Sequence, residues 1–182
     1  MIYLTSDFHF CHNKEFLFQG RGFETIDEMN KAIIQNVNSI VMPEDILIIA
    51  GDCMLNDNEK GIECLKQLNG IKRLVIGNHD TDNRIKIYRE ENIFEEISYA
   101  VRFRYKKECF YISHYPTYTS NTDKKQIINL YGHLHSKTKI NQINPQGIHI
   151  GLDSNDLKPI SIEECYRITK SGLLTIQRRE YK

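Results

Sequence analysis

The sequence predicts a single α/β domain, residues 1–182, whose second half becomes antiparallel. In the first half, short apolar runs alternate with segments of helical periodicity, which is typical of βαβ units in a mostly parallel sheet. In the second half, the apolar runs 96–105 and 108–113 are separated only by Lys106 and Lys107, which favours an antiparallel hairpin. The length of 182 residues and the hydrophobic content of 40% suit one globular domain.

The first half begins with a predicted buried strand over residues 1–6 and a loop over residues 8–22. Thr25 and Glu28 have the spacing of a capping box, and apolar residues then recur at helical spacing, so a helix is predicted over 25–41. The other elements of this half are predicted in turn as a strand over 46–50, a helix over 56–69, a strand over 71–76 and a helix over 81–91. The continuous apolar run 46–50 is typical of a strand that is covered on both faces.

The elements that follow the hairpin are predicted to be short. They are strands over 128–131, 148–152 and 173–178, and a helix over 161–166. Ser161 and Glu164 have the spacing of a second capping box, which places the start of that helix. From the residues alone, the fold class is therefore α/β with an antiparallel second half.

Polar motifs rich in histidine follow the predicted strands. In chain order they are Asp7-Phe8-His9, Gly51-Asp52, Gly77-Asn78-His79-Asp80, Ser113-His114 and Gly132-His133-Leu134-His135. In open α/β sheets, binding sites gather beyond the carboxyl ends of the strands. Carboxylates, an amide oxygen and imidazoles are ligands that suit Mn, Fe, Zn or Ni. The sequence therefore predicts a transition-metal centre at this edge.

The order of these motifs resembles that of the calcineurin-like metallophosphoesterases, which runs D-x-H, G-D, G-N-H-[DE], a lone H and G-H-x-H. All five blocks occur here between Asp7 and His135. The blocks D-x-H and G-D are common by chance, whereas G-N-H-D and G-H-x-H together are specific. The resemblance implies a four-layer αββα sandwich, in which helices flank two mixed β-sheets.

The resemblance also implies a dinuclear centre with Asp52 as the bridging ligand. The ligands of the first metal would be Asp7, His9 and His135, and those of the second would be Asn78, His114 and His133. The ions would be Mn, or alternatively Fe, Ni or Zn, and would supply a hydroxide for in-line attack on phosphorus. His79 is expected outside the ligand set, where it can protonate the leaving oxygen. Asp80 is expected to orient His79 or to cap the following helix.

Substrate contacts are predicted less directly. His12 and Arg21 in the loop after the first motif, and Arg84 after the third, are candidates to bind phosphate, with an ordinary surface position as the alternative. Four aromatic residues could flank a base or sugar, although packing is the alternative for the two phenylalanines: Phe8, Phe10, Tyr115 and Tyr118. His149 lies in an alternating segment, and we expect a structural role for it.

The composition limits the binding partners and the cellular location that we expect. The formal net charge is zero, which excludes a global basic field for nucleic acid or an acidic membrane. The five cysteines form no C-x-x-C pair and no signal peptide is recognisable, so reduced thiols and a cytoplasmic location are expected. No apolar run approaches the ~20 residues that span a bilayer, so no membrane association is expected.

The expected function is that of a metal-dependent phosphoester hydrolase. A chain of this length leaves little room for a domain that covers the site, which favours phosphodiesters of the nucleotide or nucleic-acid-end type. A phosphomonoesterase of the same fold is the first alternative. A mononuclear zinc hydrolase and a catalytically silent scaffold are the others. We expect a small phosphoester or nucleotide substrate and no obligatory protein partner, while an oligomer remains open.

Overall fold

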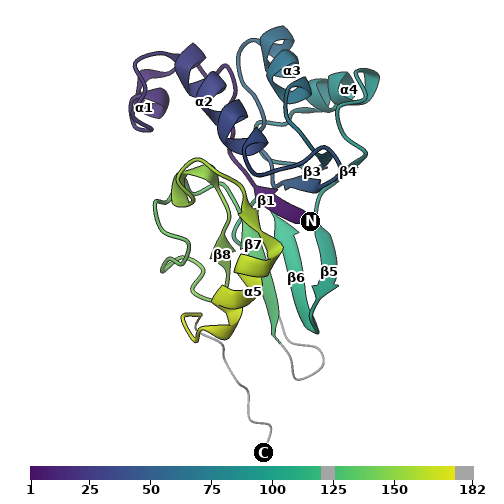
Figure 1. Ribbon diagram of the computed structural model, residues 1–182, viewed down its shortest axis with the longest axis vertical. Helices are drawn as coiled ribbons and strands as arrows, with labels where there is room; N and C mark the ends of the chain where they lie inside the picture. The colour runs from purple at the N-terminus through teal and green to yellow at the C-terminus, as the bar shows by residue number, and fades with distance from the viewer. Residues whose placement is uncertain (120–125, 175–182) are drawn as a thin grey trace, which may run out of the picture.

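The computed structural model describes residues 1–119 and 126–174 and contains two β-sheets (Figure 1). The strands of the first sheet lie in the order β4-β3-β2-β1-β9. Their bounds are Glu96–Ser98, Ile71–Val75, Ile46–Ile49, Ile2–Thr5 and Ile160–Ser161 in that order. The strands β1 to β4 are parallel and β9 runs antiparallel to β1. The carboxyl ends of β1, β2 and β3 therefore share one edge.

The second sheet contains four strands in the order β5-β6-β7-β8. Their bounds are Val101–Tyr105, Glu108–Ser113, Ile127–Tyr131 and Ile148–His149. The hairpin of β5 and β6 is antiparallel, as predicted, and β6, β7 and β8 are parallel to one another. Both sheets are therefore mixed, which confirms the expected fold class.

The helices of the first half lie together at one end of the molecule, and α5 lies beside the second sheet (Figure 1). Their bounds are Glu15–Phe18 for α1, Ile26–Asn38 for α2, Asn58–Lys66 for α3, Asp82–Glu90 for α4 and Ile162–Lys170 for α5. The capping box at α2 is present, since the Glu28 N–H donates to Thr25 Oγ1 and the Glu28 carboxylate accepts from the Thr25 N–H. Ser161 caps α5 as expected.

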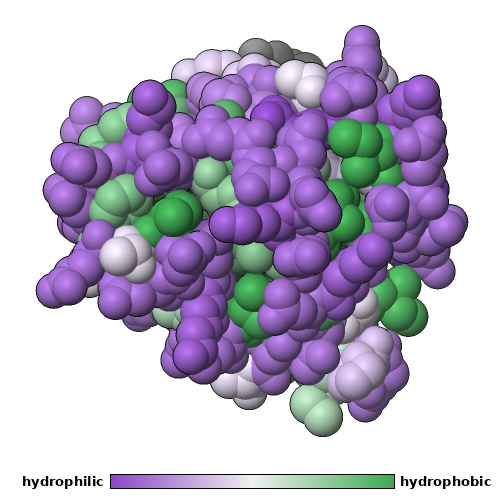
Figure 2. Space-filling view, turned by 90° about the horizontal axis from the view of Figure 1, so that it is seen from above, coloured by the Kyte–Doolittle hydropathy of each residue, from purple (hydrophilic) through white to green (hydrophobic). Residues whose placement is uncertain are grey.

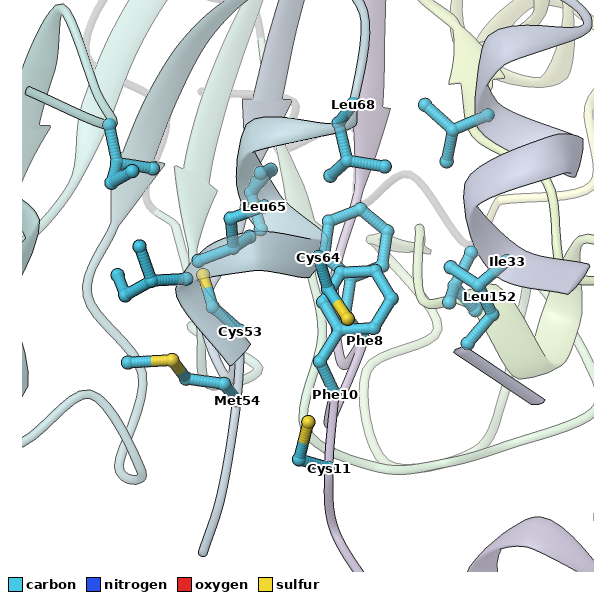
Figure 3. Packing of buried hydrophobic residues seen from close by; sticks show 14 of the residues in the cluster. Phe8, Phe10, Cys11, Ile33, Cys53, Met54, Cys64, Leu65, Leu68 and Leu152 are labelled. Carbon is cyan, nitrogen blue, oxygen red and sulfur yellow. The ribbon is translucent and has the colours of Figure 1, made fainter. Parts of the chain in front are cut away.

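The strand β2 separates two hydrophobic cores. Leu47 and Ile49 point to a core formed with α1–α4, in which the stacked rings of Phe8 and Phe10 lie 5.1 Å apart (Figure 3). Ile48 points to the other core, which contains β6 and β7 and the buried face of α5. Successive side chains of a strand alternate between its faces, so this strand is buried on both, as its continuous apolar run predicts.

One predicted strand is divided between the two sheets. The run 96–105 was expected to be continuous, but β4 ends at Ser98 in the first sheet and β5 begins at Val101 in the second. Tyr99, at the crossing point, is 80% exposed. The alternation of apolar residues continues through both strands, so the pattern conceals the change of sheet.

Two smaller differences concern short elements, and one further prediction is untested. Residues 8–22 were expected to be a loop but contain α1, whose four residues follow Lys14, a residue that provides no side-chain cap. The two-residue strand β9 is too short to leave a pattern in the sequence. The predicted strand over 173–178 falls largely on residues 175–178, which lie outside the described residues.

The surface over α1–α4 is mostly hydrophilic, and its apolar side chains form small separate groups (Figure 2). Within residues 1–119 and 126–174, every helix is too short or too polar to cross a bilayer.

Candidate metal centre

The predicted ligands come together where the two sheets meet. Asp7 follows β1, Asp52 follows β2 and Asn78 follows β3, while His114 and the pair His133 and His135 follow β6 and β7. Two hydrogen bonds join the sheets at this edge. His114 Nδ1 lies 2.8 Å from the Ala50 carbonyl oxygen, and the His133 N–H donates to Asp7 Oδ2 at 2.9 Å.

Three of the ligands form what we call the first cluster: Asp7, His9 and His135. Their ligand atoms all lie within 4.8 Å of one another, and His9 Nε2 is 3.0 Å from His135 Nε2. Asp7 and His9 are almost fully buried, whereas the His135 side chain is 37% exposed. The cluster therefore opens toward solvent on the His135 side.

The second cluster contains Asp52, His114 and His133, whose ligand atoms also lie within 4.8 Å of one another. Asn78 belongs beside it, since its Oδ1 is 2.8 Å from His114 Nε2. Asp52 Oδ2 lies 3.5 Å from His114 Nε2 and 3.7 Å from His9 Nε2. One carboxylate oxygen thus faces imidazoles of both clusters, which is the position a bridging ligand requires.

Burial shifts the pKa values of three of these ligands. It raises the pKa of the Asp7 carboxyl and, together with the nearby His135, lowers the pKa of His9 to about 2. Burial and repulsion from His114 also lower the pKa of His133. Neutral imidazole is the form that binds a metal, and buried carboxylates need a positive charge beside them. The donor set therefore fits divalent transition ions.

The backbone at the site is unusual. Five ligands have positive φ angles, namely Asp7 at 61°, His9 at 51°, Asp52 at 58°, His133 at 69° and His135 at 47°. Residues other than glycine rarely adopt this left-handed region, and such residues concentrate at functional sites where the surrounding structure holds them. The positive φ angles are thus a second, independent indication that this edge is the functional site.

Two motif glycines are required by the packing of the ligands. A Cβ atom on Gly77 would overlap Asp52 Oδ1, and one on Gly132 would lie 2.8 Å from Asp7 Oδ2. The glycines that precede Asn78 and His133 in the sequence therefore leave room for the two buried carboxylates.

Comparison with known families matches residues 1–164 to the calcineurin-like phosphoesterases. The chain belongs to this family.

Proteins of comparable length are also similar to this phosphoesterase. The uncharacterized protein MJ1445 of Methanocaldococcus jannaschii is 31% identical over 94% of this chain and 92% of its own length. The Gene 66 protein of Mycobacterium phage D29 is 27% identical over 94% of this chain and 98% of its own length. Among solved structures, the protein AQ665 of unknown function from Aquifex aeolicus is 26% identical with a TM-score of 0.70, over 92% of this chain and 98% of its own.

His79 lies at the mouth of the phosphoesterase site. Its side chain is 40% exposed, and its Nε2 is 3.9 Å from Asp52 Oδ2. Its backbone N–H donates to the other oxygen of Asp52 at 2.8 Å. Its ring also lies close enough to His9 and Asp52 to share a metal with them, so the geometry allows a role as proton donor or as ligand.

Asp80 supports Asp52, the predicted bridging ligand. Its carboxylate accepts the backbone N–H groups of Asp52 at 2.9 Å and Gly77 at 2.9 Å, and also the Tyr88 hydroxyl at 3.1 Å. The expectation that Asp80 caps α4 is wrong, because Thr81 is the N-cap residue. Its oxygens instead fix the bend that carries Asp52.

Arg21 was expected to contact phosphate, and the structure contradicts this. Its side chain is only 3% exposed and forms a paired contact with the Asp153 carboxylate at 2.8 and 2.9 Å. It also donates to the carbonyl oxygens of Phe8 at 3.0 Å and Asp7 at 2.7 Å. The guanidinium holds the first motif in place and is not available to a substrate.

Asp153 was missed by the sequence analysis. It accepts from Arg21 and lies 2.8 Å from His135 Nδ1, which leaves His135 Nε2 facing the first cluster. Burial alone would raise the pKa of Asp153, but hydrogen bonds from His135 and Arg21 lower it below its usual value. Such partners orient metal-binding histidines. Asp153 directly follows the predicted strand 148–152, so its place at a strand end was the available indication.

The other candidates lie at the margin of the site. The His12 ring is 5.3 Å from the His9 ring, and Arg84 donates to the His79 carbonyl oxygen at 2.6 Å. The two phenylalanines among the aromatic candidates, Phe8 and Phe10, are fully buried, which confirms packing for both. His149 is also fully buried, behind the site.

Proposed function

We propose that this protein is a dinuclear metal-dependent phosphodiesterase that acts on esters of the nucleotide or nucleic-acid-end type. The observation that carries the proposal is Asp52, whose Oδ2 lies between His9 of the first cluster and His114 of the second. Two divalent ions bound there would polarise the phosphoryl oxygens and lower the pKa of a water molecule, so that hydroxide is available near neutral pH.

The residues of the site would have separate roles in metal binding and proton transfer. Asp52 would bridge the ions, and Asp80 would fix its position through backbone hydrogen bonds. Asp7, His9 and His135 would hold one ion, and Asn78, His114 and His133 the other. His79, which lies beside Asp52 and is open to solvent, would donate a proton to the leaving oxygen.

The openness of the site supports a diester. The side chains of His79 and His135 are 40% and 37% exposed, so a substituent on each side of the phosphorus can extend into solvent. His12 and Arg84 stand at the same opening and are proposed to contact the phosphate or its substituents. We further propose Mn as the native ion and the cytoplasm as the location, which suits five cysteines that are all free thiols.

The test combines metal analysis with two model esters. Purified protein should contain two ions per chain, lose activity on prolonged chelation, and recover it better with Mn than with Mg, because imidazole ligands favour softer ions. Bis-p-nitrophenyl phosphate should be hydrolysed faster than p-nitrophenyl phosphate. Faster hydrolysis of the monoester would establish the phosphomonoesterase instead. Two bound ions without hydrolysis of either ester would indicate a silent scaffold.

A further inference from the structure

Two exposed aromatic side chains border the metal centre. Phe16 is 74% exposed and Tyr115 is 51% exposed. Single exposed apolar residues are ordinary on a protein surface, so exposure alone carries no meaning. Their positions carry the argument, because each ring lies beside a different cluster.

Tyr115 borders the second cluster. Its ring centroid lies 5.1 Å from that of His114 and 4.7 Å from that of His133. Its backbone is held in place, since its carbonyl oxygen accepts from Ser113 Oγ at 2.8 Å and Thr117 Oγ1 at 3.0 Å. The half-exposed ring thus lies beside two predicted metal ligands, on a backbone that these hydrogen bonds hold.

Phe16 borders the first cluster through His12. The rings of Phe16 and His12 lie 5.9 Å apart, and the His12 ring lies 5.3 Å from His9 and 6.4 Å from His79. Phe16 stands on α1, which is anchored by the buried Leu17 and Phe18 that follow it. This second aromatic wall lies on the same side of the centre as His79.

We infer that Tyr115 and Phe16 stack the two bases of a substrate in which a phosphodiester joins two nucleosides in single-stranded form. The inference rests on the proposed phosphodiesterase function. Bases stack on exposed aromatic rings with little regard to sequence, because every base has a flat π face. A duplex would bury those faces within its own stack. A net charge of zero provides no global basic field to attract a long backbone, which favours a short substrate or a free end.

The position of His79 indicates which aromatic ring stacks which of the two bases. In the proposed hydrolysis a water molecule first loses a proton to solvent. The resulting hydroxide oxygen bonds to phosphorus, the bond from phosphorus to the leaving oxygen breaks, and His79 supplies a proton to that oxygen. Since Phe16 and His12 lie on the His79 side, Phe16 stacks the leaving nucleoside. Tyr115 stacks the nucleoside that keeps the phosphate.

The kinetic test uses Mn-loaded protein and four dinucleotide analogues, with a base on both sides, on either side alone, or on neither. Tyr115→Ala should lower kcat/KM about tenfold when the retained side carries a base and leave the fully abasic analogue unchanged. Tyr115→Phe keeps the ring and should match the wild type. Phe16→Ala should show the same loss for the leaving side, and Phe16→Tyr should not.

The outcomes separate the two proposals. If the wild type hydrolyses all four analogues equally well, the stacking inference is wrong while the phosphodiesterase stands. If it hydrolyses none of the analogues and no other diester, the proposed function itself fails. An equal loss on all four analogues in Tyr115→Ala would show that the ring supports His114 or His133 and binds no base.

Fluorescence gives a readout that does not depend on turnover. The sequence contains no tryptophan, so Tyr115→Trp introduces a single tryptophan at the rim, which can be excited selectively over the tyrosines. Adenosine monophosphate should quench it with saturation, and ribose phosphate should not. Met42→Trp is the control, because Met42 is 54% exposed and precedes β2, whereas the site follows that strand. Absence of quenching in the Tyr115→Trp variant, or equal quenching in both variants, would overturn the inference.

Discussion

The two clusters of the metal centre are supported in different ways. In the first cluster, the orientation of His135 depends on a side chain, because its Nδ1 lies 2.8 Å from the Asp153 carboxylate. Asp153 is in turn paired with the buried Arg21, which also holds the carbonyl oxygen of Asp7. This support is a relay of charged side chains that are distant in the sequence.

In the second cluster the main chain takes part in the support. His114 Nδ1 lies 2.8 Å from the Ala50 carbonyl oxygen. The backbone N–H of Asp52 donates to the Asp80 carboxylate, which holds Asp52 in place. A substitution cannot remove a main-chain carbonyl, whereas it can remove a carboxylate. A single change at Asp153 should therefore remove the support of His135, whereas no substitution can remove the carbonyl oxygen that faces His114.

The largest effect should come from Asp52, the residue proposed to bridge the two clusters. Asp52→Asn keeps the shape of the side chain but removes the charge that is proposed to bridge the ions. Turnover should fall about 10³-fold or more, since metal-ion stabilisation supplies several kcal/mol to the transition state. Elemental analysis should show loss of metal from both clusters, while circular dichroism stays unchanged. Retention of two ions in this variant would remove Asp52 from the bridging position.

A loss that depends on the leaving group is expected for His79→Ala. General acid catalysis contributes about 10²–10⁴-fold, so a nucleotide ester should lose activity on that scale. A p-nitrophenyl ester should lose much less, because p-nitrophenolate departs readily without a proton. Both clusters should keep their metal. Equal losses on both esters would argue for positioning, and loss of metal would make His79 a ligand.

A smaller and selective effect is expected for Asp153→Asn. Partners of metal-binding histidines typically contribute about 10- to 100-fold to metal affinity, and only the first cluster depends on this one. Calorimetric titration with Mn should show one weakened step and one unchanged step. Asp27→Asn, a change at an exposed position on α2, is the matched control. Equal weakening of both steps would mean that the clusters are not supported separately.

The smallest effect concerns stability and pH. Because the pKa of Asp153 is lowered in the folded protein, its carboxylate stabilises the fold at pH values above its unfolded pKa of about 4. That contribution is lost as the pH falls through the lower folded value. In metal-free protein, the free energy of unfolding of the wild type should exceed that of Asp153→Asn by about 1–3 kcal/mol near neutral pH. This gap should narrow progressively as the pH falls below about 4. Urea unfolding at several pH values measures it, and a gap that is constant down to acid pH would contradict the role of the charge.

Much of the fold followed from local patterns, and the exceptions were of two kinds. The capping box at Thr25 and the double-sided burial of β2 are properties of short segments, and both are present. Residues 96–105 are divided at Tyr99 because the two halves join different sheets. Apolar alternation is the same in either sheet, so it could not reveal this division. The helix α1 and the strand β9 have too few residues to form a periodic pattern.

For the candidate site, the sequence alone determined the chemical nature of the donors and their place at strand ends. Motif spacing records both, because each motif follows its own strand directly. Tertiary structure decided the role of residues that act through distant partners. Arg21 is a surface candidate in the sequence, but burial against Asp153 turns it into a support for the first motif. The two residues are separated by 132 positions, and only the packing of the two sheets brings them together.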